Sequence, residues 1–196
     1  MRELWLVQYL DMMESIPRAI TSAVIKIAIW VTPVIFLVKV MEKHNPLSYL
    51  GLRYNFKKGL KWVCWVSLVF IAYFVILNFI VLKSNIDFQM GLHEWLNIVL
   101  LVGITEEIVF RGFLLRKLMD SYKFWIANTI TALLFVSIHF PIWFYKDLFE
   151  FSYLLNGITT TFVLGIILGF IYKKSNSLWS VIIVHSLYNL LVSLFY

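Results

Sequence analysis

Three ionisable side chains lie close together in an otherwise apolar stretch of the sequence. The segment T-E-E-I-V-F-R-G contains Glu106, Glu107 and Arg111. On a helix, Glu107 and Arg111 are one turn apart, in the order that favours an ion pair. Glu106 points about 100° away around the helix, so it is the acid left free to act. A pair that only locks helix packing would account for Glu107 and Arg111 but leaves Glu106 unexplained.

Two further apolar stretches carry polar side chains at helical spacing. The segment F-V-S-I-H places Phe135 and His139 on one face, and H-S-L-Y-N does the same for His185 and Asn189. A buried imidazole can polarise a water molecule or bind a metal, and an imidazole with a carboxamide can form an oxyanion hole. The structural alternatives are a packed, hydrogen-bonded His139 and an interhelical hydrogen bond through His185 and Asn189.

The elements that must position these side chains are membrane helices. Hydrophobic residues make up 61% of the chain and charged residues 14%, whereas soluble domains have about 45–50% and about 25%. A soluble chain of 196 residues cannot bury so much apolar surface, but a bilayer can serve as its solvent. A charge at the centre of a spanning helix costs about 2.5–3.5 kcal/mol. The charged cluster therefore favours a functional site.

Six segments are long and apolar enough to span a bilayer, which takes about 20 residues. They cover residues 20–40, 62–82, 95–119, 124–143, 153–172 and 178–196. We therefore predict an all-α, polytopic transmembrane bundle that forms a single integral membrane domain over residues 1–196. At about 1.5 Å per residue, Glu106, His139 and His185 lie roughly 10–21 Å from the expected cytoplasmic ends of their segments. They can thus meet in a mid-membrane cavity, where we expect the active site.

The net charge of +6 indicates basic cytoplasmic loops and not a nucleic-acid surface. Membrane lipids are therefore expected partners and nucleic acid is not, while the oligomeric state stays open. Lys26, near the start of the first segment, is expected to extend its amine toward the interface. Gly165 and Gly169 form G-x-x-x-G, which predicts a closely packed neighbouring helix.

The three motifs together resemble the CAAX-protease and bacteriocin-processing family of intramembrane proteases (Abi, Rce1-like, CPBP). The segment E-E-I-V-F-R resembles the family's E-E-x-x-x-R, F-V-S-I-H its F-x-x-x-H, and H-S-L-Y-N its H-x-x-x-N, in the family's order. The resemblance covers about residues 95–196, which would form the protease core.

The resemblance implies an intramembrane glutamic endopeptidase that needs no cofactor. Glu106 and His139 would activate the attacking water, and His185 and Asn189 would stabilise the oxyanion. Supporting roles would fall to Glu107, Arg111 and Phe135. The short chain is similar to the compact bacterial branch, which implies the cell membrane and favours substrates such as bacteriocins, pheromones or leader peptides over prenylated proteins.

Three other readings of the same residues remain open. The first is a non-catalytic bacteriocin self-immunity or regulatory protein that binds a peptide or a sensor kinase through the cavity. The second is a proton-coupled transporter, although the inverted repeat of many transporters is missing. The third is a zinc-dependent protease with Glu106, His139 and His185 as ligands, although the H-E-x-x-H spacing is absent.

Overall fold

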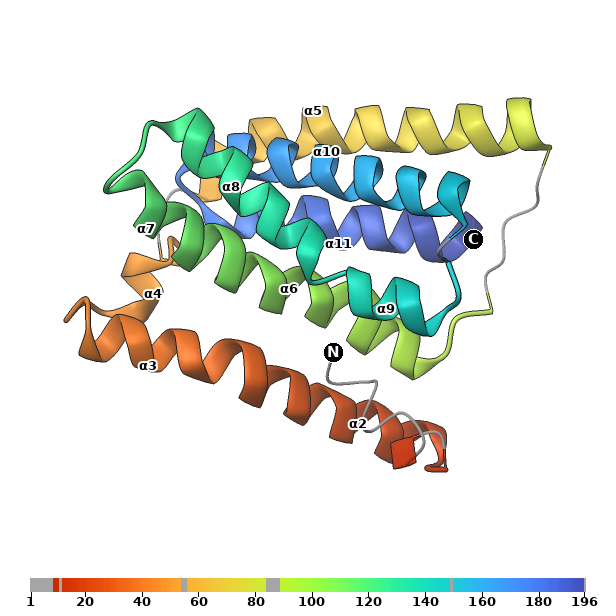
Figure 1. The fold of residues 1–196 in the computed structure, drawn as a ribbon, viewed down its shortest axis with the longest axis horizontal. Helices are drawn as coiled ribbons and strands as arrows, with labels where there is room; N and C mark the ends of the chain where they lie inside the picture. Colours follow the sequence, from red (N-terminus) through yellow and green to blue (C-terminus); the bar gives the residue numbers. More distant parts are fainter. Residues whose placement is uncertain (1–8, 11, 54–55, 84–88, 149, 196) are drawn as a thin grey trace.

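Helices account for all regular secondary structure in the part of the chain that the computed structural model describes, residues 9–10, 12–53, 56–83, 89–148 and 150–195 (Figure 1). The first half contains α2 (Ser15–Lys26), η1 (Ile27–Val31), α3 (Thr32–Val40), α4 (Pro46–Tyr49), α5 (Phe56–Val75) and η2 (Ile76–Leu82), where η marks a π-helical segment. The second half contains η3 (Glu94–Leu100), α6 (Leu101–Glu107), η4 (Ile108–Leu115), α7 (Arg116–Met119), α8 (Phe124–Ser137), α9 (Phe140–Tyr145), α10 (Phe151–Ser175) and α11 (Leu178–Phe195).

The prediction of a polytopic helical bundle is confirmed. Within the described ranges, five helices are long and apolar enough to cross a membrane: Ser15–Val40, Phe56–Leu82, Phe124–Tyr145, Phe151–Ser175 and Leu178–Phe195. The sequence predicted six such segments. The remaining one, from η3 to α7, is helical throughout, but Glu106, Glu107 and Arg111 make its centre too charged to count as an ordinary apolar span.

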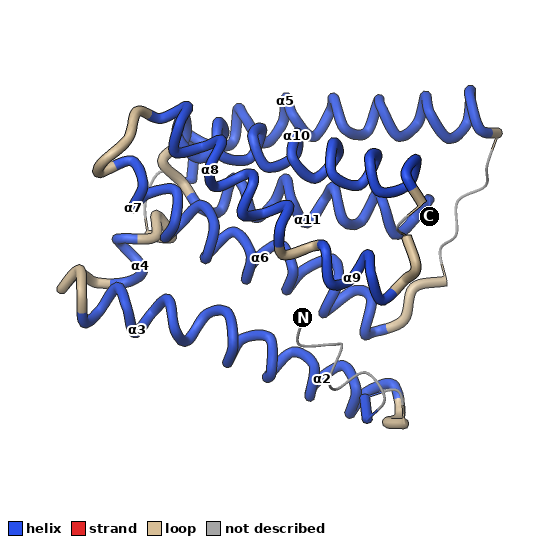
Figure 2. The backbone as a smooth tube through the Cα atoms, viewed as in Figure 1, coloured by secondary structure: helices blue, strands red, loops and turns tan. Residues whose placement is uncertain are grey.

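The charged helix run from η3 to α7 lies inside the bundle. It passes between α2 and α3 on one side and α8, α10 and α11 on the other (Figure 2). Its buried residues include Gly103, Glu107, Phe110, Arg111 and Leu115. Its central charges therefore face protein and not lipid, which is how a helix with this composition is accommodated.

The fourth predicted segment is interrupted in the structure. The predicted span over residues 124–143 lies within the apolar stretch Phe124–Tyr145, but inside it helix α8 ends at Ser137 and α9 begins at Phe140. Pro141 has no backbone N–H and cannot donate to the carbonyl one turn before it. His139 lies in this break as the residue that precedes α9.

Two glycines of α10 allow α8 to approach closely. A Cβ added at Gly165 would lie 3.0 Å from the Cβ of Ala132, and one added at Gly169 would lie 1.8 Å from Oδ1 of Asn128. Nδ2 of Asn128 also donates to the carbonyl oxygen of Ile166 at 3.1 Å. The close contact predicted from G-x-x-x-G is confirmed.

Gly165→Leu is expected to lower the stability of the folded protein by about 1–3 kcal/mol, because overpacking forces side chains and backbone to shift. The thermal midpoint of the protein in detergent, followed by circular dichroism, measures this effect. Gly91→Ala is the control, because among the described residues a Cβ there meets only the carboxyl end of the Glu94 side chain. Equal midpoints for the two variants would show that α8 and α10 do not depend on this contact.

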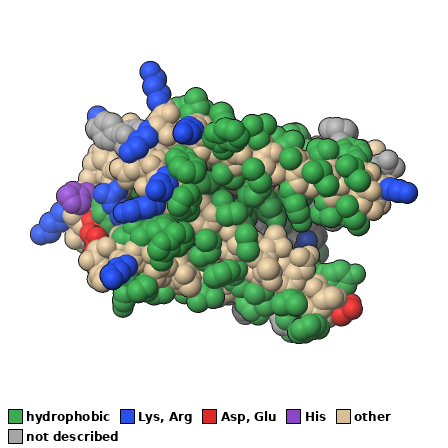
Figure 3. All heavy atoms as spheres, turned by 90° about the horizontal axis from the view of Figure 1, so that it is seen from above, with side chains coloured by type: hydrophobic (Ala, Val, Ile, Leu, Met, Phe, Trp, Pro, Cys, Tyr) green, Lys and Arg blue, Asp and Glu red, His purple; other side chains and the backbone are tan. Residues whose placement is uncertain are grey.

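Lysine and arginine side chains gather at one end of the bundle, as the blue side chains at the left of Figure 3 show. At this end, Nη1 of Arg116 donates to the carbonyl oxygen of Tyr49, and the guanidinium lies 4.5 Å from the centre of the Tyr49 ring. Basic residues favour the cytoplasmic side. We therefore predict that this end faces the cytoplasm.

Candidate active site

A buried ion pair links the E-E-I-V-F-R motif to two other helices. Nη1 of Arg111 donates to Oε1 of Glu107 at 2.7 Å, as the spacing of four residues predicted. Both side chains are fully buried. Nη2 of Arg111 donates to the carbonyl oxygen of Gly165 in α10 at 3.1 Å, and the guanidinium lies 4.6 Å from the ring centre of Phe135 in α8. Arg111 therefore joins Glu107 to both α8 and α10.

The same carboxylate oxygen of Glu107 holds His185. Nδ1 of His185 lies 2.7 Å from Oε1 of Glu107. A carboxylate can only accept in such a bond, so Nδ1 is the donor. Nε2 is therefore the ring nitrogen left for other contacts, and it lies 3.9 Å from Oε2 of Glu106. This orientation of His185 was not evident from the sequence, because no spacing rule relates residues so far apart on two helices.

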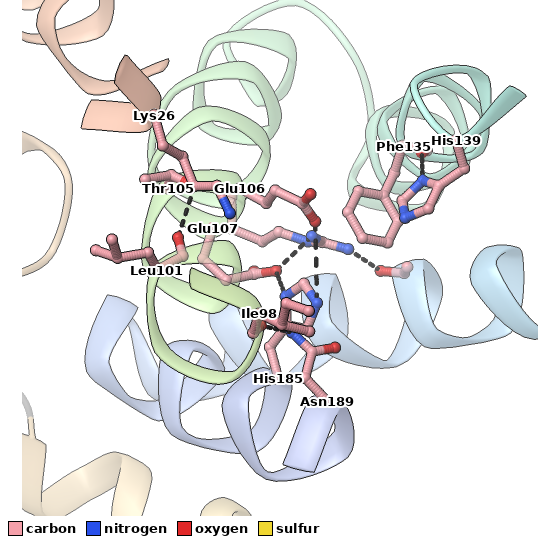
Figure 4. Close-up of polar contacts among 12 residues, drawn as sticks. Lys26, Ile98, Leu101, Thr105, Glu106, Glu107, Phe135, His139, His185 and Asn189 are labelled. Carbon is pink, nitrogen blue, oxygen red and sulfur yellow. Dashed lines mark hydrogen bonds and ion pairs between the residues drawn. The ribbon is translucent and has the colours of Figure 1, made fainter. Parts of the chain in front are cut away.

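The Glu106 carboxylate is less buried and less fixed by hydrogen bonds to the described residues than that of Glu107. Its side chain is 14% exposed, whereas that of Glu107 is fully buried. Oε2 of Glu106 has no hydrogen-bond partner among the described residues. Figure 4 shows the carboxylate pointing away from its own helix, toward the space between His139 and His185. The structure thus gives the two neighbouring acids the different surroundings that helical spacing predicted.

His139 reaches the cluster from the break between α8 and α9. Its Nδ1 lies 2.8 Å from the carbonyl oxygen of Phe135, which can only accept, so Nδ1 donates and Nε2 remains available. The Phe135 ring meets the His139 ring edge-on at 4.9 Å and the His185 ring at 5.8 Å, measured between ring centres. Phe135 therefore contacts both imidazoles.

Asn189 lies one turn after His185 on α11. Its Nδ2 donates to the carbonyl oxygen of Ile98 in η3 at 3.2 Å. A carboxamide nitrogen carries two N–H bonds, so the other remains for a ligand. The structure thus holds Asn189 by a backbone carbonyl that sequence reasoning did not identify, because a carbonyl carries no residue-specific signal.

The described residues contain no group of three or more His, Cys, Asp or Glu side chains placed to hold a metal ion together. Nε2 of His185 lies 3.9 Å from Oε2 of Glu106, but His139 does not join them in such a group. The three-ligand zinc alternative would therefore require His139 to move toward the other two side chains.

Lys26 is buried, and the expectation that its amine reaches the interface is wrong. The residue is 6% exposed, and its Nζ donates to the carbonyl oxygen of Asn97 in η3 at 2.5 Å. Nδ2 of Asn97 in turn donates to the carbonyl oxygen of Ala19 at 2.9 Å. These bonds fix α2 against η3, the segment that also holds Asn189.

Comparison with known proteins identifies the family. The model of the family described as type II CAAX prenyl endopeptidase Rce1-like matches residues 88–191. No curated protein and no solved structure gave a significant match. The matched region contains all three motifs and more than half of the chain. With five apolar helices in the part of the chain that the structure describes, the protein is a multi-pass membrane protein, and it belongs to the Rce1-like family of type II CAAX prenyl endopeptidases.

Proposed function

We propose that the protein hydrolyses peptide bonds of membrane-associated peptides or proteins with a water molecule activated by Glu106 and His139. Family membership supports an intramembrane endopeptidase in general. The observation that carries the finer proposal is the Glu106 carboxylate, whose Oε2 has no hydrogen-bond partner among the described residues and lies 3.9 Å from Nε2 of His185. A carboxylate in these surroundings is suited to act as a general base.

The geometry suggests a division of roles in the reaction. Glu106 would take a proton from water as the water oxygen attacks the peptide carbonyl, while Nε2 of His139 accepts the second O–H and aligns it. The carbonyl oxygen then gains negative charge, which the free N–H of Asn189 and a protonated Nε2 of His185 would stabilise. As the C–N bond breaks, Glu106 would return its proton to the leaving nitrogen.

Glu107 and Arg111 would act by positioning in this scheme. The carboxylate of Glu107 fixes which nitrogen of His185 faces Glu106. Arg111 holds that carboxylate through its own 2.7 Å bond. Such outer partners orient the groups that touch the reacting atoms.

Comparative peptidomics tests the proposal and identifies the substrate. Membranes and medium from cells with the wild-type protein are compared with those from cells with Glu106→Gln or His139→Ala. We expect a peptide product that is present with the wild type and absent with both variants, and bacteriocin, pheromone or leader peptides are the proposed precursors. A non-catalytic immunity or regulatory protein would instead give identical peptide profiles in all three samples.

Removal of metal is expected to leave the rate of cleavage unchanged, since the proposed mechanism uses only side chains. The purified protein is treated with 1,10-phenanthroline and assayed on a fluorogenic peptide that spans the identified cleavage site. A zinc peptidase in the same detergent serves as the control and should lose activity. Loss of cleavage that zinc restores would favour the zinc alternative with Glu106, His139 and His185.

A further inference from the structure

Trp143 contacts the His139 imidazole from the next turn of the chain. The two ring centres are 5.8 Å apart, with the planes tilted by 36°. The backbone N–H of Trp143 also donates to the carbonyl oxygen of His139 at 3.1 Å. The imidazole already meets Phe135 edge-on at 4.9 Å. It therefore lies against two aromatic rings, one four residues before it and one four residues after it.

The Trp143 indole packs against the backbone of α10 at Gly157. A Cβ added at Gly157 would lie 3.1 Å from Cζ2 and 3.2 Å from Cε2 of the indole. The Phe140 ring contacts the indole as well, at 5.3 Å between centres. Because α10 also carries the Gly165 carbonyl that binds Arg111, the helix that holds the buried ion pair also holds Trp143.

The position of His139 needs such support, because regular helix does not supply it. His139 lies between the end of α8 and the start of α9, next to Pro141. The bond from Nδ1 to the Phe135 carbonyl fixes which nitrogen is protonated, but one hydrogen bond still allows the ring to tilt about it. A packed second ring restricts that tilt.

We infer that Trp143, seated on Gly157, is a positioning residue that holds the His139 imidazole with Nε2 directed at the cluster of Glu106 and His185. This inference rests on the proposed function, in which His139 aligns the attacking water. Figure 4 shows the imidazole turned toward that cluster. Small displacements of a reacting group are costly, because a shift of about 1 Å can lower a rate by about 10²-fold.

Kinetics on the fluorogenic peptide provide the first test. Trp143→Leu is expected to lower kcat by about 10- to 100-fold with little change in KM, since the contact orients a reacting group and not the substrate. Trp143→Phe, which keeps an aromatic ring, should recover most of the rate. Gly157→Ala should lower kcat in the same way by displacing the indole. The control is Trp125→Leu on α8, whose side chain is 59% exposed, and its kcat should match the wild type.

Nitrogen NMR of the histidine rings in lipid nanodiscs provides a second test that does not depend on activity. The chain has four histidines, and His139→Gln identifies the His139 signals. Trp143→Leu and Gly157→Ala should move these signals, and Trp125→Leu should not. If Trp143→Leu fails to fold, Gly157→Ala decides. Unmoved His139 signals overturn the inference, whatever the rate, because any loss of kcat would then be structural. If the wild type cleaves no peptide, the proposed function fails, while the spectra still decide whether Trp143 holds His139.

Discussion

Glu106→Gln is expected to lower kcat for peptide cleavage by about 10²–10⁴-fold, the range for loss of a general base. The amide keeps the shape of the side chain but cannot take up the proton of the attacking water. The fold should survive, because Oε2 of Glu106 has no hydrogen-bond partner among the described residues and the side chain is partly exposed. Single-turnover rates measure the loss, and size-exclusion profiles in detergent verify the fold.

Two further carboxylates make the Glu106 experiment specific. Glu94→Gln changes an acid at the start of the same helix run, in η3, and should leave kcat unchanged. Glu107→Gln weakens the link to both Arg111 and His185, so it should lower the thermal midpoint as well as the rate. A Glu106→Gln protein that cleaves at the wild-type rate would remove Glu106 from the mechanism.

Peptide binding by the Glu106→Gln variant separates an enzyme from a binding protein. The proposed protease should bind its substrate at the otherwise unchanged site but release no product. A self-immunity or regulatory protein would bind equally well with and without Glu106, and the wild type would release no product either. Affinity capture of the uncleaved peptide, followed by mass spectrometry of the bound and free fractions, distinguishes the two.

The parts of the site that follow from local geometry were predictable from the sequence. Glu107 and Arg111 are four residues apart on one helix, and the structure pairs them at 2.7 Å. Phe135 and His139 are likewise four apart, and their rings touch. For Glu107 and Arg111 the period of the helix alone sets the distance, and Phe135 and His139 keep a similar spacing although His139 follows the end of α8. The number of apolar segments was predictable to within one helix for the same reason, since span length depends only on bilayer thickness.

The parts that depend on helix packing were not predictable. The bond between Glu107 and His185 joins different helices, and so does the bond between Asn189 and the Ile98 carbonyl. Hydropathy identifies spans but not which faces meet. The prediction for Lys26 was wrong for this reason. Its amine was expected to reach the interface, but η3 packs against α2, and the amine donates to the carbonyl oxygen of Asn97 in η3 instead.

Arg111→Met is expected to destabilise the folded protein by about 3–5 kcal/mol, because removing one partner of a buried ion pair leaves the other charge uncompensated. Among the described residues, the variant leaves Glu107 with His185 as its polar partner, and it removes the guanidinium contacts to the Gly165 carbonyl and the Phe135 ring. The thermal midpoint in detergent measures the effect. The control is Lys117→Met, whose exposed pair with Glu42 at 2.9 Å should contribute little to stability.

The double variant with Glu107→Gln and Arg111→Met separates stability from positioning. A buried ion pair replaced on both sides is often close to neutral for stability, so the midpoint should largely recover. Catalysis should not recover, because the neutral amide at position 107 no longer binds Nδ1 of His185 as a carboxylate does. A double variant with wild-type kcat would show that the pair only stabilises the bundle. Recovery of the midpoint without recovery of the rate would show that the buried charge is retained for the orientation of His185.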